Sequence, residues 1–147
     1  MTDTLETRLR RLEGLEEIRS LLTEYGRLLD RRDLAGYAAL FAKDGSWTGP
    51  YIGSAIGPKA IQELLESKLS AVAGDEPAGA HHIMSNMMID IEGSTARVWS
   101  RWTFVVPGAE RKPTLALCGH YDDVLTLEGG RWKFKSRVVS GDLPGVD

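Results

Sequence analysis

Two segments of this sequence carry side chains that could perform acid–base chemistry. Asp30 lies near the end of the first apolar-periodic segment, where the negative end of a helix dipole disfavours a carboxylate. His81 and His82 open a later segment, and because neighbours in a strand point to opposite faces, only one of them can enter an interior. An imidazole changes its charge near neutral pH and can act as a general base. Taken singly, the simpler interpretation is a solvated helix end and a surface or packed histidine.

Further polar candidates lie on the later, apolar segments. On a strand that starts at His82, Met84 and Asn86 share the face of that histidine. Arg137 lies in the last apolar run, where the plain alternative is an exposed cation on an edge strand. His120 is either a second pocket histidine or a surface residue, and the spacing does not decide between the two.

The remaining candidate residues are aromatic side chains and one cysteine. Tyr25 belongs to the apolar stripe of the first segment, and Trp47 and Trp102 could form the walls of a pocket. Cys118 is the only cysteine, which excludes an internal disulfide framework and a cysteine-based zinc cluster. No His-Glu-x-x-His or comparable spacing supports a metal site built from Asp30 and the histidines, so no metal ligands are expected.

The first half of the chain must supply helices that position these side chains. Apolar residues recurring at gaps of three and four predict one long amphipathic helix over roughly residues 4–31. Its first half is rich in Arg and Glu and is either a solvent-exposed extension or a partner contact. Asp33 can N-cap a second helix, which Gly45 would stop. A third helix opens at Pro58, a residue favoured in the first helical turn, and ends near Gly74.

The second half of the chain carries the pattern of strands. Apolar segments joined by short turns predict an antiparallel meander of four strands, at residues 81–91, 95–106, 114–127 and 131–139. A short strand near Trp47 can precede the third helix. Helices followed by strands predict an α+β domain with helices packed on one face of a curved sheet. The segments expected to be flexible are 73–80 and 107–113, and the tail 141–147 is expected to be either loose or docked at the mouth of a pocket.

Length and charge narrow the classes of function. A chain of 147 residues fits one domain, expected to span residues 1–147. A net charge of −3 leaves no large basic field for nucleic-acid phosphates, so no nucleic-acid partner is expected. No apolar run approaches the length of a membrane span, and the N-terminus lacks the layout of a signal peptide. The expected location is the cytoplasm, with no membrane partner.

Several short motifs together resemble a known family. Each motif is weak alone, but their order and spacing over residues 8–140 are similar to the SnoaL-like branch of the nuclear-transport-factor-2-like superfamily. The matching stretches are Glu-Ile-Arg-Ser-Leu-Leu-Thr-Glu-Tyr-Gly-Arg-Leu-Leu-Asp-Arg-Arg-Asp (17–33), Leu-Phe-Ala-Lys-Asp-Gly-Ser-Trp (40–47), His-x-x-x-Asn (82–86), Gly-His-Tyr-Asp-Asp (119–123) and Gly-Arg-Trp-Lys-Phe (130–134). The resemblance implies a cone-shaped α+β fold. In it, a strongly curved, mainly antiparallel mixed sheet wraps around the N-terminal helices and encloses a deep apolar pocket.

Within that branch, the polar positions are most similar to scytalone dehydratase, bile-acid 7α-dehydratase and the lindane dehydrochlorinase. The resemblance implies elimination of a small leaving group from a cyclic, mostly apolar substrate without a cofactor. Asp30 and His82 fall on the working Asp–His pair of these enzymes. Tyr25 matches a tyrosine of the bile-acid enzyme, and Arg137 and Trp47 match residues of the dehydrochlorinase. Scytalone dehydratase has a further histidine on the next strand, which this sequence lacks.

The resemblance assigns roles to these positions. His82 would remove a proton as general base, and Asp30 would fix its tautomer and stabilise the imidazolium. Tyr25 and Arg137 would stabilise a developing oxyanion or the departing group. The residues expected to bind a ring-sized ligand are Trp47, Met84, Asn86, Trp102, Phe104, His120 and Tyr121.

Two other interpretations of the site stay open at this point. One is a polyketide cyclase or ketosteroid-type isomerase that uses the same base. The other is a non-catalytic ligand-binding or assembly module of the same fold. In either case a homo-oligomer, dimer or trimer, is expected. Segment 95–106 would present Trp99 between Arg97 and Arg101 on its outer face, which is a plausible subunit contact.

Overall fold

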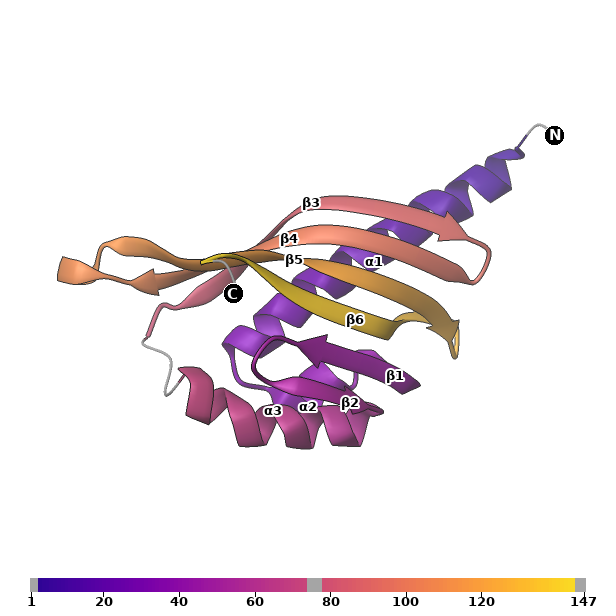
Figure 1. The fold of residues 1–147 in the computed structure, drawn as a ribbon. Helices are drawn as coiled ribbons and strands as arrows, with labels where there is room; N and C mark the ends of the chain where they lie inside the picture. Colours follow the sequence, from indigo (N-terminus) through magenta and orange to yellow (C-terminus); the bar gives the residue numbers. More distant parts are fainter. Residues whose placement is uncertain (1–2, 74–77, 145–147) are drawn as a thin grey trace.

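The protein is seen in a computed structural model that describes residues 3–73 and 78–144. Helix α1 (Leu5–Asp30) is the long helix predicted from the apolar spacing, and its N-cap Thr4 accepts a hydrogen bond from the backbone N–H of Thr7. The first three turns extend into solvent, which is one of the two alternatives predicted for the Arg- and Glu-rich first half of this helix. Leu5, Leu9 and Leu12 are exposed, whereas burial begins beyond Leu12 and is complete at Ile18. Figure 1 shows why: the N-terminal turns of α1 project beyond the sheet.

Helix α2 (Leu34–Ala38) begins at the predicted cap, where Asp33 accepts from the backbone N–H of Gly36 at 2.9 Å. The prediction that this helix continues to Gly45 is wrong. Phe41 instead starts strand β1 (Phe41–Gly49), because it pairs with Phe134 in the sheet. Helix α3 (Pro58–Ala73) opens at the predicted proline.

Six strands form one sheet in the order β2-β1-β6-β5-β4-β3. The strands after β1 are β2 (Gly53–Ile56), β3 (His81–Glu92), β4 (Thr95–Pro107), β5 (Pro113–Glu128) and β6 (Arg131–Leu143). The predicted meander is confirmed, since β3 to β6 pair antiparallel in chain order. Strand β1 pairs with β6 in parallel, which makes the sheet mixed.

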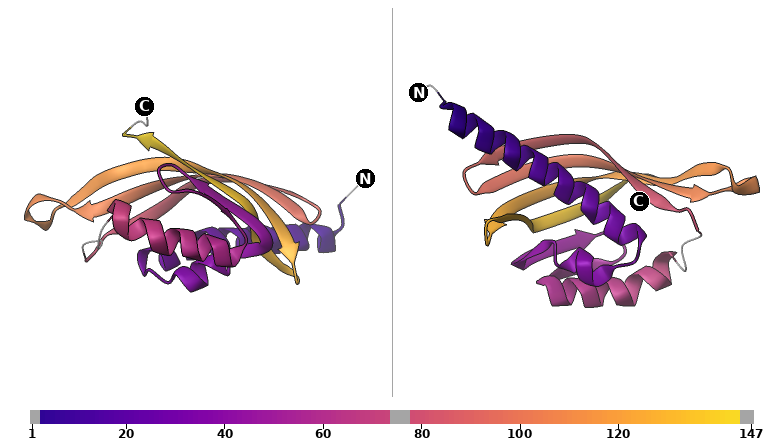
Figure 2. Two further views of the ribbon diagram at one scale, coloured as in Figure 1. Left: turned by 60° about the horizontal axis from the view of Figure 1, so that its bottom comes forward. Right: turned by 180° about the vertical axis from the view of Figure 1, so that it is seen from behind.

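The sheet is strongly curved, and all three helices lie on one of its faces, as the left view of Figure 2 shows. The core fills the space between helices and sheet. Its fully buried members include Ile18, Leu22, Phe41, Ile61, Leu125 and Phe134. The fold is therefore the expected α+β cone. Within the described part of the chain, the outer face of the sheet carries no helix.

Segment 107–113 is partly ordered, and the described part of the tail lines a cavity at Gly141, Leu143 and Pro144, as its docked alternative predicts. A single turn of 3-10 helix (Ala109–Arg111) joins β4 to β5, and β6 continues through Leu143 instead of ending at residue 139. Pairing with β5 up to Cys118 accounts for this extension. Parts of the segments expected to be loose, residues 74–77 and 145–147, lie outside the described residues. Among the helices that are described, none has the length and hydrophobicity needed to cross a membrane.

Candidate active site

The last turn of α1 and the first residues of β3 meet and bring Asp30 against His82. The Nδ1 atom of His82 lies 2.6 Å from Oδ1 of Asp30. The backbone N–H of His82 also donates to both carboxylate oxygens, at 3.1 Å each. These contacts explain how a carboxylate is held at the unfavourable end of a helix dipole: two N–H groups of His82, one from the ring and one from the backbone, solvate it. The two side chains are largely withdrawn from water, with 12% of His82 and 18% of Asp30 exposed.

The hydrogen bond to Asp30 sets the chemistry of the His82 ring. A carboxylate accepts, so Nδ1 carries the proton and the lone pair of a neutral ring is at Nε2. His82 lines a cavity, whereas Asp30 lies behind it. The adjacent His81 is exposed, and its Nδ1 lies 2.9 Å from the carbonyl oxygen of Gly79. The pair thus has the geometry of a general base with an orienting acid.

The cavity has a volume of about 280 Å³ and is lined mostly by apolar side chains. Helices α1, α2 and α3 and strands β1, β3, β4, β5 and β6 all contribute to it. Six of the residues singled out from the sequence line it, namely Tyr25, Trp47, His82, Trp102, Phe104 and Tyr121. Because one molecule of liquid water occupies about 30 Å³, the cavity has room for about nine water-sized groups, which suits a ligand of one or two rings.

A hydrogen-bonded group of aromatic residues lies across the cavity lining. The hydroxyl of Tyr37 donates to the hydroxyl oxygen of Tyr25, and Nε1 of Trp47 donates to the same oxygen at 3.1 Å. With its oxygen accepting from both, Tyr25 can direct its own O–H toward a cavity ligand. Burial is the main cause that raises the pKa of Tyr37 well above its ordinary value, and the neighbouring Tyr25 raises it further. Tyr37 therefore remains a neutral donor.

Arg137 is buried beside this group but does not line the cavity. Its Nε and Nη2 atoms donate to the two carboxylate oxygens of Asp123, at 2.7 and 2.6 Å. Its guanidinium carbon lies 4.0 Å from the ring centre of Tyr25 and 3.8 Å from that of Tyr121. Burial opposes the charge of Arg137, but attraction to Asp123 raises its pKa above the ordinary value. Arg137 is therefore a permanent cation behind the aromatic rings, and in this structure it reaches the cavity only through them.

Two residues expected in the pocket lie outside it. Strand β3 has a register shift between Ser85 and Met88, and Asn86 adopts a positive φ of 52° there. This β-bulge breaks the alternation that would place Asn86 on the face of His82, and Asn86 is exposed. Met84 remains on the inner side, but its methyl group packs close to Gly26 of α1 instead of lining the cavity.

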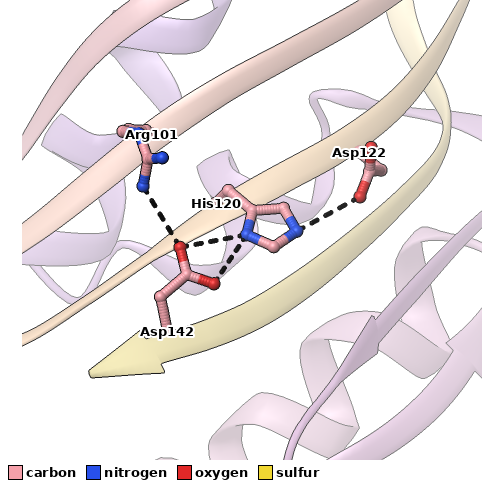
Figure 3. Close-up of polar contacts among 4 residues, drawn as sticks. All are labelled: Arg101, His120, Asp122 and Asp142. Carbon is pink, nitrogen blue, oxygen red and sulfur yellow. Dashed lines mark hydrogen bonds and ion pairs between the residues drawn. The ribbon is translucent and has the colours of Figure 1, made fainter. Parts of the chain in front are cut away.

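His120 also lies outside the cavity, on the outer face of the sheet. It points away from its strand neighbour Tyr121, which lines the cavity. Figure 3 shows its ring between two carboxylates: Nδ1 is 2.8 Å from Asp142, and Nε2 is 3.5 Å from Asp122. Alternation along β5 accounts for this, since the side chain next to an inward tyrosine must point outward. The described residues contain no group of three histidine, cysteine or acidic side chains that could hold a metal.

Sequence reasoning missed several members of the site, among them Arg32 and Tyr37, which line the cavity, and Asp123, which pairs with Arg137. Tyr37 appears in the sequence only as part of the apolar face of a short helix, and its contact with Tyr25 depends on how α2 packs. Asp123 was open to prediction, because a period of two from Tyr121 places it on the inner face of β5. The register of the sheet then pairs Asp123 directly with Arg137.

Comparison with known proteins places the fold in a family. A family model described as a SnoaL-like domain matches residues 10–138, whereas no curated protein sequence matches the chain. A nuclear-transport-factor-2-like protein with a cystatin-like fold, from Novosphingobium aromaticivorans, superposes with a TM-score of 0.83 at 23% identity, covering 99% of this chain and 94% of that chain. LinA superposes with a TM-score of 0.77 at 20% identity over 92% and 90% of the two chains. At these identities, the two structures establish the fold alone.

A further structure is somewhat nearer in sequence. It is a protein from Novosphingobium aromaticivorans proposed to be a scytalone dehydratase, which is 27% identical and has a TM-score of 0.72. The alignment covers 95% of this chain and 89% of that one. Since the family model spans most of the sequence and the cone fold is the one seen in a nuclear-transport-factor-2-like protein, the chain belongs to the SnoaL-like domain family.

Proposed function

We propose that this protein is a cofactor-independent lyase that eliminates water or a similar small leaving group from a cyclic, mostly apolar substrate. The observation that carries the proposal is the hydrogen bond of 2.6 Å between Asp30 and Nδ1 of a histidine that lines an apolar cavity. The structural neighbour proposed to be a scytalone dehydratase supports the same class of reaction.

The proposed reaction starts with proton transfer to His82. Nε2 removes the proton next to a ring carbonyl, and the electron pair of the C–H bond moves to the carbonyl oxygen to form an enolate. Asp30 stabilises the imidazolium that results. Tyr25 donates its hydroxyl hydrogen to the enolate oxygen, and its own oxygen is polarised by the donors Tyr37 and Trp47.

The second step expels the leaving group. The enolate electrons form the new C=C bond as the bond between carbon and the β-hydroxyl oxygen breaks. The imidazolium of His82 gives its proton to the departing hydroxide, so water leaves and the base is regenerated. Each turnover therefore needs no redox partner. The apolar lining limits competition from bulk water for the enolate.

A β-hydroxyketone with two fused rings tests this proposal. Elimination of water from 3-hydroxy-1-tetralone gives a ketone that tautomerises to 1-naphthol, whose fluorescence reports turnover. His82→Ala should lower kcat/KM by at least about 100-fold. The matched control is His81→Ala, which removes the neighbouring, outward-facing histidine and should change kcat/KM by less than twofold. Equal turnover by the wild type and His82→Ala, or no turnover by the wild type, would contradict the proposal.

The Tyr25 hydroxyl favours one second candidate, an isomerase of cyclic enones. An enolate held by a phenol donor is also the intermediate of a double-bond shift, with the proton returned to carbon instead of a group leaving. Cyclohex-3-enone is a suitable probe because its conjugated product absorbs in the ultraviolet. Conversion of this enone without elimination from the hydroxytetralone would assign the isomerase, and the reverse result would assign the lyase.

A further inference from the structure

Asp142 is the extra residue of a β-bulge near the end of β6. On β5, Gly119 pairs with Gly141 and Cys118 pairs with Leu143, so Asp142 has no partner in the ladder. A bulge bends its strand and re-aims the side chains beside it. Gly141 and Leu143, which flank Asp142, both line the cavity. The bulge thus decides where this wall of the cavity lies.

Side chains of two other strands hold the Asp142 carboxylate on the outer face of the sheet. Nδ1 of His120, from β5, lies 2.8 and 3.1 Å from its two oxygens. Nη1 of Arg101, from β4, donates to Oδ2 at 3.3 Å. Figure 3 shows the three side chains converging from three adjacent strands. Because the ladder does not pair Asp142, these contacts are what fixes it.

The histidine of this group is itself held in place. Its ring stacks on Trp99 with the ring centres 6.1 Å apart and the planes 29° apart. The guanidinium carbon of Arg101 lies over the ring of the same Trp99, 5.1 Å from its centre. Only 27% of the His120 side chain and 32% of the Asp142 side chain are exposed. These residues do not touch the cavity, so any effect on it passes through the backbone of β6.

We propose that His120 and Arg101 are positioning residues that hold the Asp142 bulge and thereby set the cavity wall formed by Gly141 and Leu143. This inference goes beyond the proposed lyase activity and holds whichever reaction the cavity supports. It assigns a task to a histidine that the base and the donors of the cavity do not use. When the outer contacts break, the end of β6 opens locally while the rest of the sheet stays paired.

Amide hydrogen exchange of the intact protein tests this proposal without needing any substrate. His120→Phe keeps an aromatic ring on Trp99 but loses the bond to Asp142. Loss of one hydrogen bond to a charged group is expected to raise exchange at residues 140–143 about tenfold. Exchange at residues 132–137 of the same strand should stay within twofold. The matched control is Asp122→Asn, whose side chain is more exposed and lies farther from the imidazole, and it should leave both regions within twofold.

A conservative variant separates positioning from simple packing. His120→Gln retains a side-chain donor, so it should restore protection at residues 140–143 relative to His120→Phe. Equal exchange along the whole strand in His120→Phe, or exchange at residues 140–143 as fast in His120→Gln as in His120→Phe, would overturn the proposal. Loss of lyase activity in His82→Ala leaves this measurement unaffected, so the two proposals fail separately.

Discussion

The ion pair between Arg137 and Asp123 gives a direct way to learn what this arginine does. Its side chains are 1% and 0% exposed, and two hydrogen bonds of 2.7 and 2.6 Å join them. Replacing the carboxylate by an amide in Asp123→Asn leaves the guanidinium buried without a counter-charge. Breaking a buried pair in this way costs about 3–5 kcal/mol, a large part of the 5–15 kcal/mol by which domains are typically stable.

Urea denaturation measures this cost. With an m-value of roughly 2 kcal/mol per molar for a small protein, the midpoint should fall by about 2 M in Asp123→Asn. Asp122→Asn is the control: it makes the same change one residue away, where the side chain is 62% exposed. It should alter the free energy of unfolding by less than about 0.5 kcal/mol.

A double variant distinguishes a lost charge partner from damaged packing. Asp123→Leu with Arg137→Met leaves no buried charge and should recover at least half of the stability lost in Asp123→Asn. A midpoint shift below about 0.5 M in Asp123→Asn would mean that water screens the pair, and the reasoning from burial would fail. If the double variant folds and still converts 3-hydroxy-1-tetralone within tenfold of the wild type, Arg137 is structural. A loss of 100-fold or more would support the role that the family resemblance implies.

Three further outcomes follow from contacts already described. Asp30→Asn should lower kcat/KM for 3-hydroxy-1-tetralone by about 100-fold or more, while urea midpoints show at most about 2 kcal/mol lost. Because burial raises the pKa of Tyr37 in the folded state, the unfolded chain loses this proton first as the pH rises above 10, and stability falls. Tyr37→Phe should make that fall smaller by about 1 kcal/mol in urea titrations between pH 10 and 11. Gly119→Ala places a methyl group against a backbone carbonyl and the indole of Trp102, and should lower the melting temperature by 5 °C or more, about 2 kcal/mol. The control Gly26→Ala meets only the flexible end of a methionine and should shift it by less than half as much.

The elements of this fold were predictable where the apolar period was long. The spacing of α1 and the proline at the start of α3 each indicated a helix, because those signals are local. Helix α2 was predicted too long because Phe41 fits a helical spacing equally well. Its position is decided by pairing with Phe134, which lies more than ninety residues away along the chain. No local pattern contains that information.

The site shows the same division between local and distant signals. That only one of two adjacent histidines faces inward followed from alternation, and that it is His82 followed from the resemblance. Asn86 and Asp142 could not be placed correctly, because each lies at a β-bulge, where one extra residue breaks the period of two. Asn86 has no glycine beside it, whereas Gly141 directly precedes Asp142 and is a local sign of that bulge. At these two positions, alternation alone cannot predict to which face of the sheet the side chain points.

The contacts of Asp30 join the catalytic pair to the fold itself. Its carboxylate accepts from the ring of His82 and from the backbone N–H of the same residue, so one group both closes α1 against β3 and orients the base. The ring cannot rotate away from the cavity without giving up its bond to a carboxylate that the backbone also holds. Tyr25 is fixed separately, by donors from α2 and β1. Tyr25 and Asp30 both lie on α1, so this one helix sets the distance between base and donor, while contacts from β3 on one side and from α2 and β1 on the other orient the two groups.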